Sequence, residues 1–327
     1  MRDHMNIFFN EAGRIRSGWR LLTFAALFFA LFFFSGAVLW GVYGLLLSFA
    51  PRLVPNAFIA NAINWVMFAA ISLAVGYFCA RKLEGLPWRS LGASLHKRWL
   101  SDLLIGALVG MATLVLVVSI VTIAGGLSFG LTSGNLALAV SKTLFASAII
   151  FIVAAFAEEA LFRGYPLQTL TRAGLAWLGV LLTSLPFAVA HLDNPNVVQP
   201  FASINTALAG VWLAAAYLKT RSLWFATGTH WAWNWVMGSF FGLPVSGITI
   251  FAPNPVMRGE DLGPAWLTGG AYGPEGGLAC TVALLLSTFF VWRTKLVRST
   301  EDLKKLTSEE NPAVREQISI LTSQPSL

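Results

Sequence analysis

Charged residues are scarce in this chain. Asp, Glu, Lys and Arg together make up 11% of its 327 residues, whereas a typical soluble domain contains about a quarter of such residues. Hydrophobic residues account for 56% of the sequence, and the mean hydropathy is +0.69. The shortage of charge excludes an ordinary soluble domain and predicts an integral membrane protein.

Cysteine is almost absent as well. Cys79 and Cys280 are the two cysteines of the sequence, and both lie inside apolar segments. This count excludes a disulfide framework and a cysteine-rich zinc site. The zinc-protease signature HExxH is also absent. No β-type alternation of apolar and polar residues is found, so helices are expected to cross the membrane.

Long apolar segments are what the chain has instead. A membrane-spanning helix needs about 20 apolar residues. The first run, 21–50, is too long for the apolar region of a signal peptide and predicts a first transmembrane helix. The sequence therefore predicts an all-α, polytopic membrane bundle of about eight transmembrane helices. The candidate segments are 19–49, 57–80, 102–126, 136–163, 175–192, 201–218, 222–242 and 277–294.

The basic residues are distributed unevenly between the two ends of these segments. All but three of the 22 lysines and arginines fall on one side, and the exceptions are Arg52, Lys142 and Arg258. The positive-inside rule then predicts that the N- and C-termini are cytosolic. The basic side is expected to face the anionic inner leaflet of the plasma membrane. A basic rim of this kind argues against a nucleic-acid partner.

Changes in composition divide the chain into four parts. Residues 1–135 contain the N-terminal helices and a basic, aromatic cytosolic loop, and 136–242 carry the polar residues discussed below. Residues 243–298 combine an extracytoplasmic Gly/Pro-rich loop, predicted to fold back over the bundle, with the last helix. Residues 299–327 form a polar cytosolic tail. A GxxxG pattern at 106–110 is given little weight, because it is common by chance in apolar sequence.

Two adjacent carboxylates interrupt an apolar helix. Glu158 and Glu159 follow a run of 14 residues in which Ser147 is the polar side chain. Residues four apart share a helical face, so Glu159 is predicted to pair with Arg163. Glu158 is rotated about 100° from Glu159 and is free to serve another role. The alternative is an ion pair at a helix end with a second glutamate reaching towards the cytosol.

Two histidines lie in later apolar segments. His191 ends the run TSLPFAVAH and shares a helical face with Phe187. His230 and Asn234 lie four residues apart in a tryptophan-rich helix, and polar side chains in such a helix usually face the bundle interior or a cavity. Taken singly, His191 reads as an interfacial residue, and His230 with Asn234 as a hydrogen-bonding pair between helices.

The polar residues together suggest hydrolysis. A buried carboxylate assisted by a histidine can activate water, and a second histidine with an asparagine can stabilise an oxyanion. With Gly164 and Ser222 as cytosolic helix ends, Glu158 lies about 9 Å and His230 about 12 Å into the membrane. Counted from Leu175, His191 lies about 24 Å deep. This disagreement predicts either a later start of the fifth helix or an altered path at Pro186.

Three short motifs in this region match a known family. The segments are EEALFR at 158–163, FAVAH at 187–191 and HWAWN at 230–234. Their order and spacing resemble the EExxxR, FxxxH and HxxxN motifs of the CPBP family of intramembrane endopeptidases. That family includes type II CAAX prenyl proteases, proteins like lysostaphin resistance protein A and bacteriocin-processing enzymes. The resemblance covers residues 140–242.

The resemblance implies a role for each matching residue. Glu158 would activate water with the help of His191, and His230 with Asn234 would stabilise the oxyanion. Glu159, Arg163 and Phe187 would be supporting residues. The cavity would open towards the cytosol and the inner leaflet. The substrate would be a membrane-associated peptide or protein, and nothing in the sequence indicates a prenyl group.

The need for a metal is left open by these residues. Glu158, His191 and His230 could form a three-ligand zinc site with an open position for water. A metal-free mechanism, in which the glutamate alone activates water, uses the same residues. The metal-free mechanism is favoured slightly, because Asn234 beside His230 suits an oxyanion donor better than a ligand shell.

The leading hypothesis is therefore an intramembrane endopeptidase that acts on the cytosolic side. The alternative is a non-enzymatic membrane immunity or scaffold protein of the same fold, in which the polar residues serve packing. Proton-coupled transport is disfavoured, because the sequence shows neither paired acids in other helices nor inverted repeats.

Overall fold

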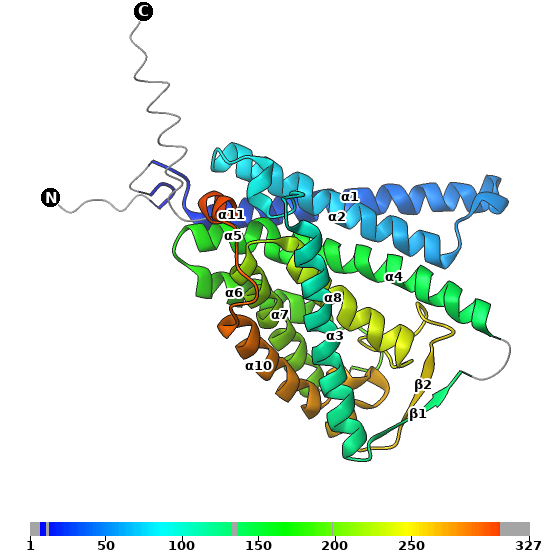
Figure 1. Ribbon diagram of the computed structural model, residues 1–327. Coiled ribbons are helices and arrows are strands. Elements are labelled where there is room, and N and C mark those ends of the chain that lie inside the picture. Colours follow the sequence, from blue (N-terminus) through cyan, green and yellow to red (C-terminus); the bar gives the residue numbers. More distant parts are fainter. Residues whose placement is uncertain (1–6, 11–12, 133–135, 198, 308–327) are drawn as a thin grey trace, which may run out of the picture.

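The computed structural model describes residues 7–10, 13–132, 136–197 and 199–307, and the chain in these ranges is mostly helical (Figure 1). The parts of the expected polar tail from 308 onward lie outside the described residues. The larger helices are α1 (Ser17–Phe49), α2 (Ala57–Leu83), α3 (Trp99–Ile123), α4 (Ala137–Glu159), α5 (Tyr165–Arg172), α6 (Ala176–Val189), α7 (Phe201–Thr220), α8 (Leu223–Trp235) and α10 (Leu278–Arg293). The shorter elements are η1 (Pro51–Leu53), η2 (Trp88–Leu91), η3 (Ala160–Gly164), η4 (Val236–Phe240), α9 (Ala265–Thr268), η5 (Gly270–Tyr272), η6 (Pro274–Gly276) and α11 (Glu301–Thr307).

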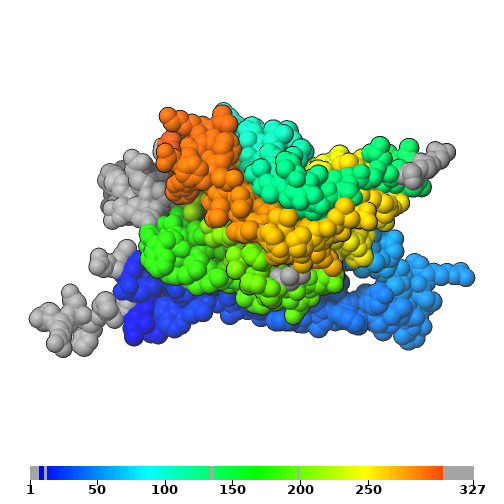
Figure 2. All heavy atoms as spheres, turned by 90° about the horizontal axis from the view of Figure 1, so that it is seen from below, coloured from blue at the N-terminus to red at the C-terminus, as the bar shows by residue number. Residues whose placement is uncertain are grey.

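Each of the eight apolar segments contains a helix. Five helical segments are long and apolar enough to cross a membrane: α1, α2, α3, the continuous stretch Ala137–Arg172, and α7. Helices α6 and α10 are apolar but shorter than a full span. Helices α1 and α2 form an elongated layer along one side of the molecule (Figure 2). A mostly helical architecture with five candidate membrane spans is thus observed, while the number of crossings and the orientation of the termini stay predictions.

The fourth predicted segment is longer than expected. Helix α4 does not end at Gly164, because a π-helical turn, η3, joins it to α5 and the helical path runs on to Arg172. Glu158 lies 14 residues before Arg172, and Gly164 between them departs from helical geometry with ψ −122°. The fourth helical segment is therefore longer than the predicted 136–163, while the point at which it leaves the membrane stays a prediction.

A small sheet was not expected from the sequence. Strand β1 (Leu127–Leu131) pairs antiparallel with β2 (Met257–Asp261), and Phe129 lies opposite Gly259 in the register. The pairing connects the α3–α4 link to the Gly/Pro-rich region, which contains short helices as well as loops. Five residues per strand give too little alternation for the pattern to stand out from the surrounding apolar sequence.

Three charged side chains from different helices form a buried ion cluster. Glu84, at the end of α2, accepts hydrogen bonds from Arg172 of α5 at 2.8 Å through Nε and Nη2, and lies 3.0 Å from Arg20 of α1. Burial by itself would raise the pKa of Glu84, but the two guanidinium groups lower it below its usual value. Arg20 and Arg172 were counted in the lipid-facing basic rim, and this assignment was wrong because both are buried.

Glycines bring α3 and α8 into backbone contact. A Cβ added at Gly106 would overlap the Phe225 carbonyl oxygen, and one added at Gly110 would overlap that of Thr229. From the other side, a Cβ at Gly228 would overlap the Leu103 carbonyl oxygen. Small residues allow this close approach in membrane helices. The GxxxG pattern at 106–110 received little weight as a sequence motif, but its glycines position the helix that carries His230.

Replacing Gly110 with alanine is expected to impair the protein through α8. The new methyl group must displace Thr229, and a displacement of about 1 Å at a reacting group can reduce turnover about 100-fold. Overpacking of this kind also costs about 1–3 kcal/mol of stability. Peptidase activity and melting temperature of the purified variant measure both effects. Gly41→Ala in α1 is the matched control, because a Cβ there meets no atom within 4 Å; equal behaviour of the two variants would contradict the prediction.

Candidate active site

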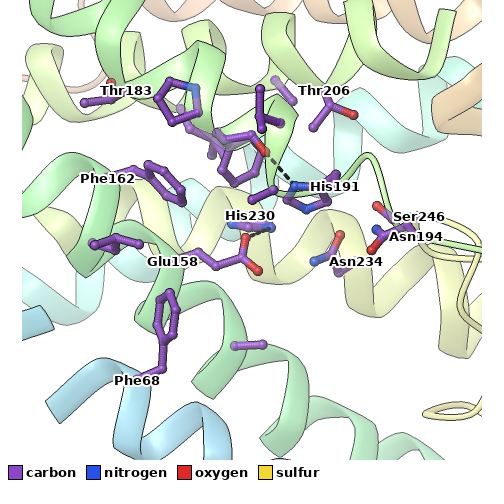
Figure 3. Close-up of a pocket in the computed structure, with 18 of the residues that line it drawn as sticks. Phe68, Glu158, Phe162, Thr183, His191, Asn194, Thr206, His230, Asn234 and Ser246 are labelled. Atoms are coloured by element: carbon purple, nitrogen blue, oxygen red, sulfur yellow. Dashed lines mark hydrogen bonds and ion pairs between the residues drawn. The ribbon is translucent and has the colours of Figure 1, made fainter. Parts of the chain in front are cut away.

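The predicted polar residues line one cavity of about 810 Å³. Glu158, His191, His230 and Asn234 surround a common space in Figure 3. These side chains come from α4, the turn after α6, and α8. The other lining residues are mostly aromatic or aliphatic and belong chiefly to α1, α2, α4, α6 and α7. The structure thus gathers in one place the four residues proposed from three separate segments.

Glu159 and Arg163 form a fully buried ion pair next to the cavity. Arg163 Nη1 lies 3.2 Å from Glu159 Oε1, and Nη2 donates to the carbonyl oxygen of Gly210 in α7 at 2.9 Å. Both side chains are 0% exposed. The predicted pairing is present, and the complete burial of Arg163 shows that it too does not belong to the basic rim. The pair fastens α4 to α7.

His230 connects the two glutamates. Its Nδ1 lies 3.0 Å from Glu159 Oε1, and its Nε2 lies 3.8 Å from Glu158 Oε2. An ionised carboxylate only accepts hydrogen bonds, so Nδ1 carries the proton and Nε2 faces Glu158. One carboxylate oxygen of each glutamate, Oε2, has no hydrogen-bond partner among the described residues. The side chain of Glu158 is 15% exposed and lines the cavity, whereas that of Glu159 is 0% exposed. Glu158 is therefore the glutamate that can contact a substrate or water.

His191 is oriented by the last turn of α6. Its Nδ1 lies 2.7 Å from the carbonyl oxygen of Phe187. A carbonyl oxygen accepts hydrogen bonds and cannot donate them, so Nδ1 carries the proton, and Nε2 of a neutral ring is an acceptor. The Phe187 ring contacts both histidine rings. Its centroid lies 4.7 Å from that of His191 and 6.1 Å from that of His230.

Phe187 also faces the buried arginine. The guanidinium carbon of Arg163 lies 4.8 Å from the centroid of the Phe187 ring, within the range of a cation–π contact. The same ring packs edge-on against Phe162 at 5.3 Å. Phe187 thus links the buried ion pair to both histidines, as expected of a supporting residue at the FxxxH position.

Helix α8 presents Asn234 to the cavity and tryptophans to its neighbours. Trp231 Nε1 donates to the carbonyl oxygen of Ala148 at 3.0 Å, and Trp235 Nε1 donates to that of Leu144 at 3.1 Å. Both acceptors belong to α4. These tryptophans hold α8 against α4, and Asn234 lines the cavity beside His230.

The helix starts can be compared with the counts made from the sequence. Helix α6 begins at Ala176, so His191 lies 15 residues from its start, and a later start of the fifth helix is not observed. Glu158 lies 14 residues before the end of α5 at Arg172, and His230 lies seven residues after the start of α8 at Leu223. The depths of these three side chains in a membrane stay predictions.

π-helical turns follow both motif helices. The turn η3 begins directly after Glu159, and η4 begins two residues after Asn234. Such turns insert an extra residue into a helix and are frequent at functional sites. Helix periodicity alone does not reveal them, because one added residue changes the pattern too little.

Part of the apolar lining of the cavity is also exposed at the surface of the protein. The lining residues Leu22 and Phe29 of α1 are 59% and 54% exposed, and Val189 of α6 is 63% exposed. The cavity is therefore bordered by exposed apolar side chains on α1 and α6.

The candidate zinc ligands do not form a recognisable metal site. Among the described residues, no group of three or more His, Cys, Asp or Glu side chains is arranged to hold a metal ion. Of these candidate ligands, His230 and Glu158 lie close together, with Nε2 of His230 3.8 Å from Oε2 of Glu158.

Residues 140–236 match the family model of the type II CAAX prenyl endopeptidase, Rce1-like. The matched range contains all three motifs and runs from α4 to the start of η4. This part of the chain is similar to Rce1-like CAAX prenyl endopeptidases. No curated protein and no solved structure matches the chain significantly.

The Rce1-like match confirms the resemblance drawn from the motifs. The family supports a CAAX-type intramembrane peptidase activity in general, and with the apolar helices it makes this an integral membrane protein. Helices α1 to α3 and the region after 236 lie outside the Rce1-like match. These outer parts nevertheless contribute to the cavity, through Phe24 and Phe28 of α1 and through Ser246 and Glu275 of the Gly/Pro-rich region.

The Gly/Pro-rich region is the part of the site that sequence reasoning missed. It was predicted to fold back over the bundle, and Ser246 and Glu275 do reach the cavity. A close approach to the rest of the protein is visible at Gly273, where a Cβ would overlap the Pro244 carbonyl oxygen and φ is +94°. The glycines and prolines were the available signal, but they did not indicate which side chains would point inward.

Proposed function

We propose that the protein is an intramembrane endopeptidase that hydrolyses a peptide bond in a membrane-associated peptide or protein. The observation that supports this most directly is the position of Glu158, which lines the cavity with a side chain that is 15% exposed, while Glu159 beside it is fully buried and paired with Arg163. Water bound in this space would contact Glu158 and His191. A general base with these contacts contributes about 10²–10⁴-fold to a hydrolysis rate.

The first step is attack of water on the scissile carbonyl carbon. Glu158 accepts one proton as the water oxygen bonds to carbon, and Nε2 of neutral His191 accepts a hydrogen bond that orients the water. The carbonyl oxygen becomes an oxyanion. Collapse of the tetrahedral intermediate breaks the C–N bond, and Glu158 returns the proton to the departing amine.

Stabilisation of the oxyanion falls to His230 and Asn234. The Asn234 amide can donate from Nδ2. His230 can donate from Nε2 only as an imidazolium, because its other proton is held by Glu159. With His230 charged, the cluster of Glu158, Glu159, Arg163 and His230 is electrically neutral, which suits a buried site. Preorganised donors of this kind are worth about 10²–10³-fold in turnover.

The exposed apolar residues that line the cavity on α1 and α6 indicate where the substrate comes from. A peptide with an apolar or lipid-modified segment could enter between α1 and α6 and place that segment along the aromatic wall of the cavity. The Rce1-like match raises prenylated proteins as one such class. We place the protein in the plasma membrane with its basic side towards the anionic inner leaflet, since the basic residues are concentrated on one side of the apolar segments.

Comparison of membrane-bound peptides by mass spectrometry tests the assignment. Cells that produce the wild-type protein are expected to contain cleaved peptides that are missing when Glu158→Gln replaces it. Glu260→Gln is the matched control, because Glu260 is exposed in β2, far along the chain from the motifs. Identical peptide profiles in all three strains, together with a preserved cellular phenotype, would favour the immunity or scaffold alternative.

A further inference from the structure

A second carboxylate reaches the cavity that contains Glu158. Glu275 belongs to η6 and lines the cavity together with Ser246, Asn205 and Thr206. Its Oε1 accepts a hydrogen bond from Trp233 Nε1 at 2.9 Å, and its Oε2 accepts from the Ser246 hydroxyl at 2.8 Å and from the Ser246 backbone N–H. Every contact is a donor to the carboxylate, which is the arrangement of an ionised group.

Glu275 differs from the other shielded carboxylates in having no cationic partner. Glu159 pairs with Arg163, Glu84 pairs with two arginines, and Asp102 lies 3.3 Å from His96. In the part of the chain that the structure describes, no basic side chain lies within ion-pair distance of Glu275. A negative charge in a mainly apolar cavity is costly unless it is compensated, so this end of the cavity favours a positively charged guest.

The loop that carries Glu275 is held in place before any ligand arrives. Asn205 Nδ2 donates to the carbonyl oxygens of Glu275 and Gly277 at 2.7 and 2.9 Å. Thr281 Oγ1 in turn donates to Asn205 Oδ1 at 2.6 Å. These bonds attach η6 to α7 and α10. A fixed carboxylate loses little conformational freedom on binding, which favours recognition.

The polar end and the aromatic end of the cavity are separated by the catalytic candidates. In Figure 3, Asn194 and Ser246 lie beyond His191 and Asn234, whereas Phe68 lies on the other side of Glu158. Ser246 is the residue that donates to Glu275. A peptide lying across Glu158 would therefore place one flank on aromatic side chains and the other near Glu275.

We propose that Glu275 forms a subsite for a cationic side chain of the peptide substrate, that of lysine or arginine. The inference rests on the proposed function, because it assigns specificity to the same cavity. The Glu275 carboxylate accepts a charge-assisted hydrogen bond from the cation in addition to those from Trp233 and Ser246. A free C-terminal carboxylate is repelled from this end, so the flank near Glu275 is not a short acidic tail.

Binding of matched peptides tests the subsite without requiring cleavage. The full-length protein with Glu158→Gln is placed in nanodiscs of uncharged phosphatidylcholine. The probes are N-myristoylated, C-terminally amidated decapeptides of alanine and leucine, labelled for fluorescence anisotropy, in which lysine or norleucine is scanned through the sequence. At one position, or two neighbouring ones, lysine is expected to bind at least about 10-fold tighter than norleucine. Glutamate at the same position is expected to bind most weakly.

The preference should depend on Glu275 itself. In Glu158→Gln/Glu275→Gln the lysine-to-norleucine ratio is expected to fall close to 1, whereas Glu158→Gln/Glu260→Gln keeps it. A cross-link from the probe lysine to Glu275, formed with the membrane-permeant reagent dicyclohexylcarbodiimide and mapped by mass spectrometry, gives a result even if Glu275→Gln does not fold.

Three results would overturn the subsite: equal binding of lysine and norleucine at every position, a preference that survives Glu275→Gln, or cross-links confined to other carboxylates. Because cleavage is not measured, a preference found in a protein that proves inactive as a peptidase would leave the subsite standing and refute only the proposed function.

Discussion

Glu158→Gln is expected to lower kcat/KM for peptide cleavage by about 10²–10⁴-fold, because the amide cannot accept the proton of the attacking water. The fold should be preserved, since Glu158 Oε2 makes no hydrogen bond among the described residues and its nearest charged neighbour is 3.8 Å away. The rate is measured with the purified full-length protein on the peptide found by mass spectrometry. The melting temperature in detergent reports on the fold.

The control for this prediction is Glu260→Gln, which removes one negative charge from an exposed site. It should retain the wild-type rate. A Glu158→Gln protein that cleaves as fast as this control would show that Glu158 is not the base. A Glu158→Gln protein that fails to fold would show instead that the carboxylate is structural, and the reading of its free oxygen would be wrong.

The neighbouring Glu159→Gln is expected to act on stability. Removing this charge leaves Arg163, which is 0% exposed, without its 3.2 Å partner, and it weakens the bond that orients His230. Breaking one side of a buried ion pair typically costs about 3–5 kcal/mol. A large drop in melting temperature and in the yield of folded protein is therefore expected, in contrast to Glu158→Gln.

A double-mutant cycle separates the ion pair from other effects. The variant Glu159→Gln/Arg163→Met removes both charges, so its loss of stability should be smaller than the sum of the two single losses. Additive losses would mean that the two side chains are not coupled. Two adjacent glutamates with opposite consequences, one for catalysis and one for folding, would be difficult to explain by packing alone.

The sequence was informative where the chemistry is local. Glu159 and Arg163 are four residues apart, so helix geometry alone predicts their pairing, and the structure contains it. The same holds for Phe187 and His191, which meet across one turn. The rarity of polar side chains in apolar segments also singled out Glu158, His230 and Asn234, since burial of such groups in a membrane is too costly without a role.

Contacts between segments that are far apart in the chain were harder to predict from the sequence. Arg20 and Arg172 were assigned to a lipid-facing rim because the sequence shows their charge but not their partner, and Glu84 is found beside them only after three helices pack. The GxxxG at 106–110 was similarly undervalued, because its meaning depends on Gly228 of a helix more than 100 residues away.

Taken alone, the sequence determined the helical membrane class, the catalytic candidates and the pairing of Glu159 with Arg163, because apolar length and helical spacing are properties of a single segment. Tertiary structure alone decided the continuation of α4 into α5 and the presence of Glu275 in the same cavity as Glu158. The reason is physical: which segments meet depends on the packing of whole helices and loops, and this information is spread over residues that are far apart in the chain.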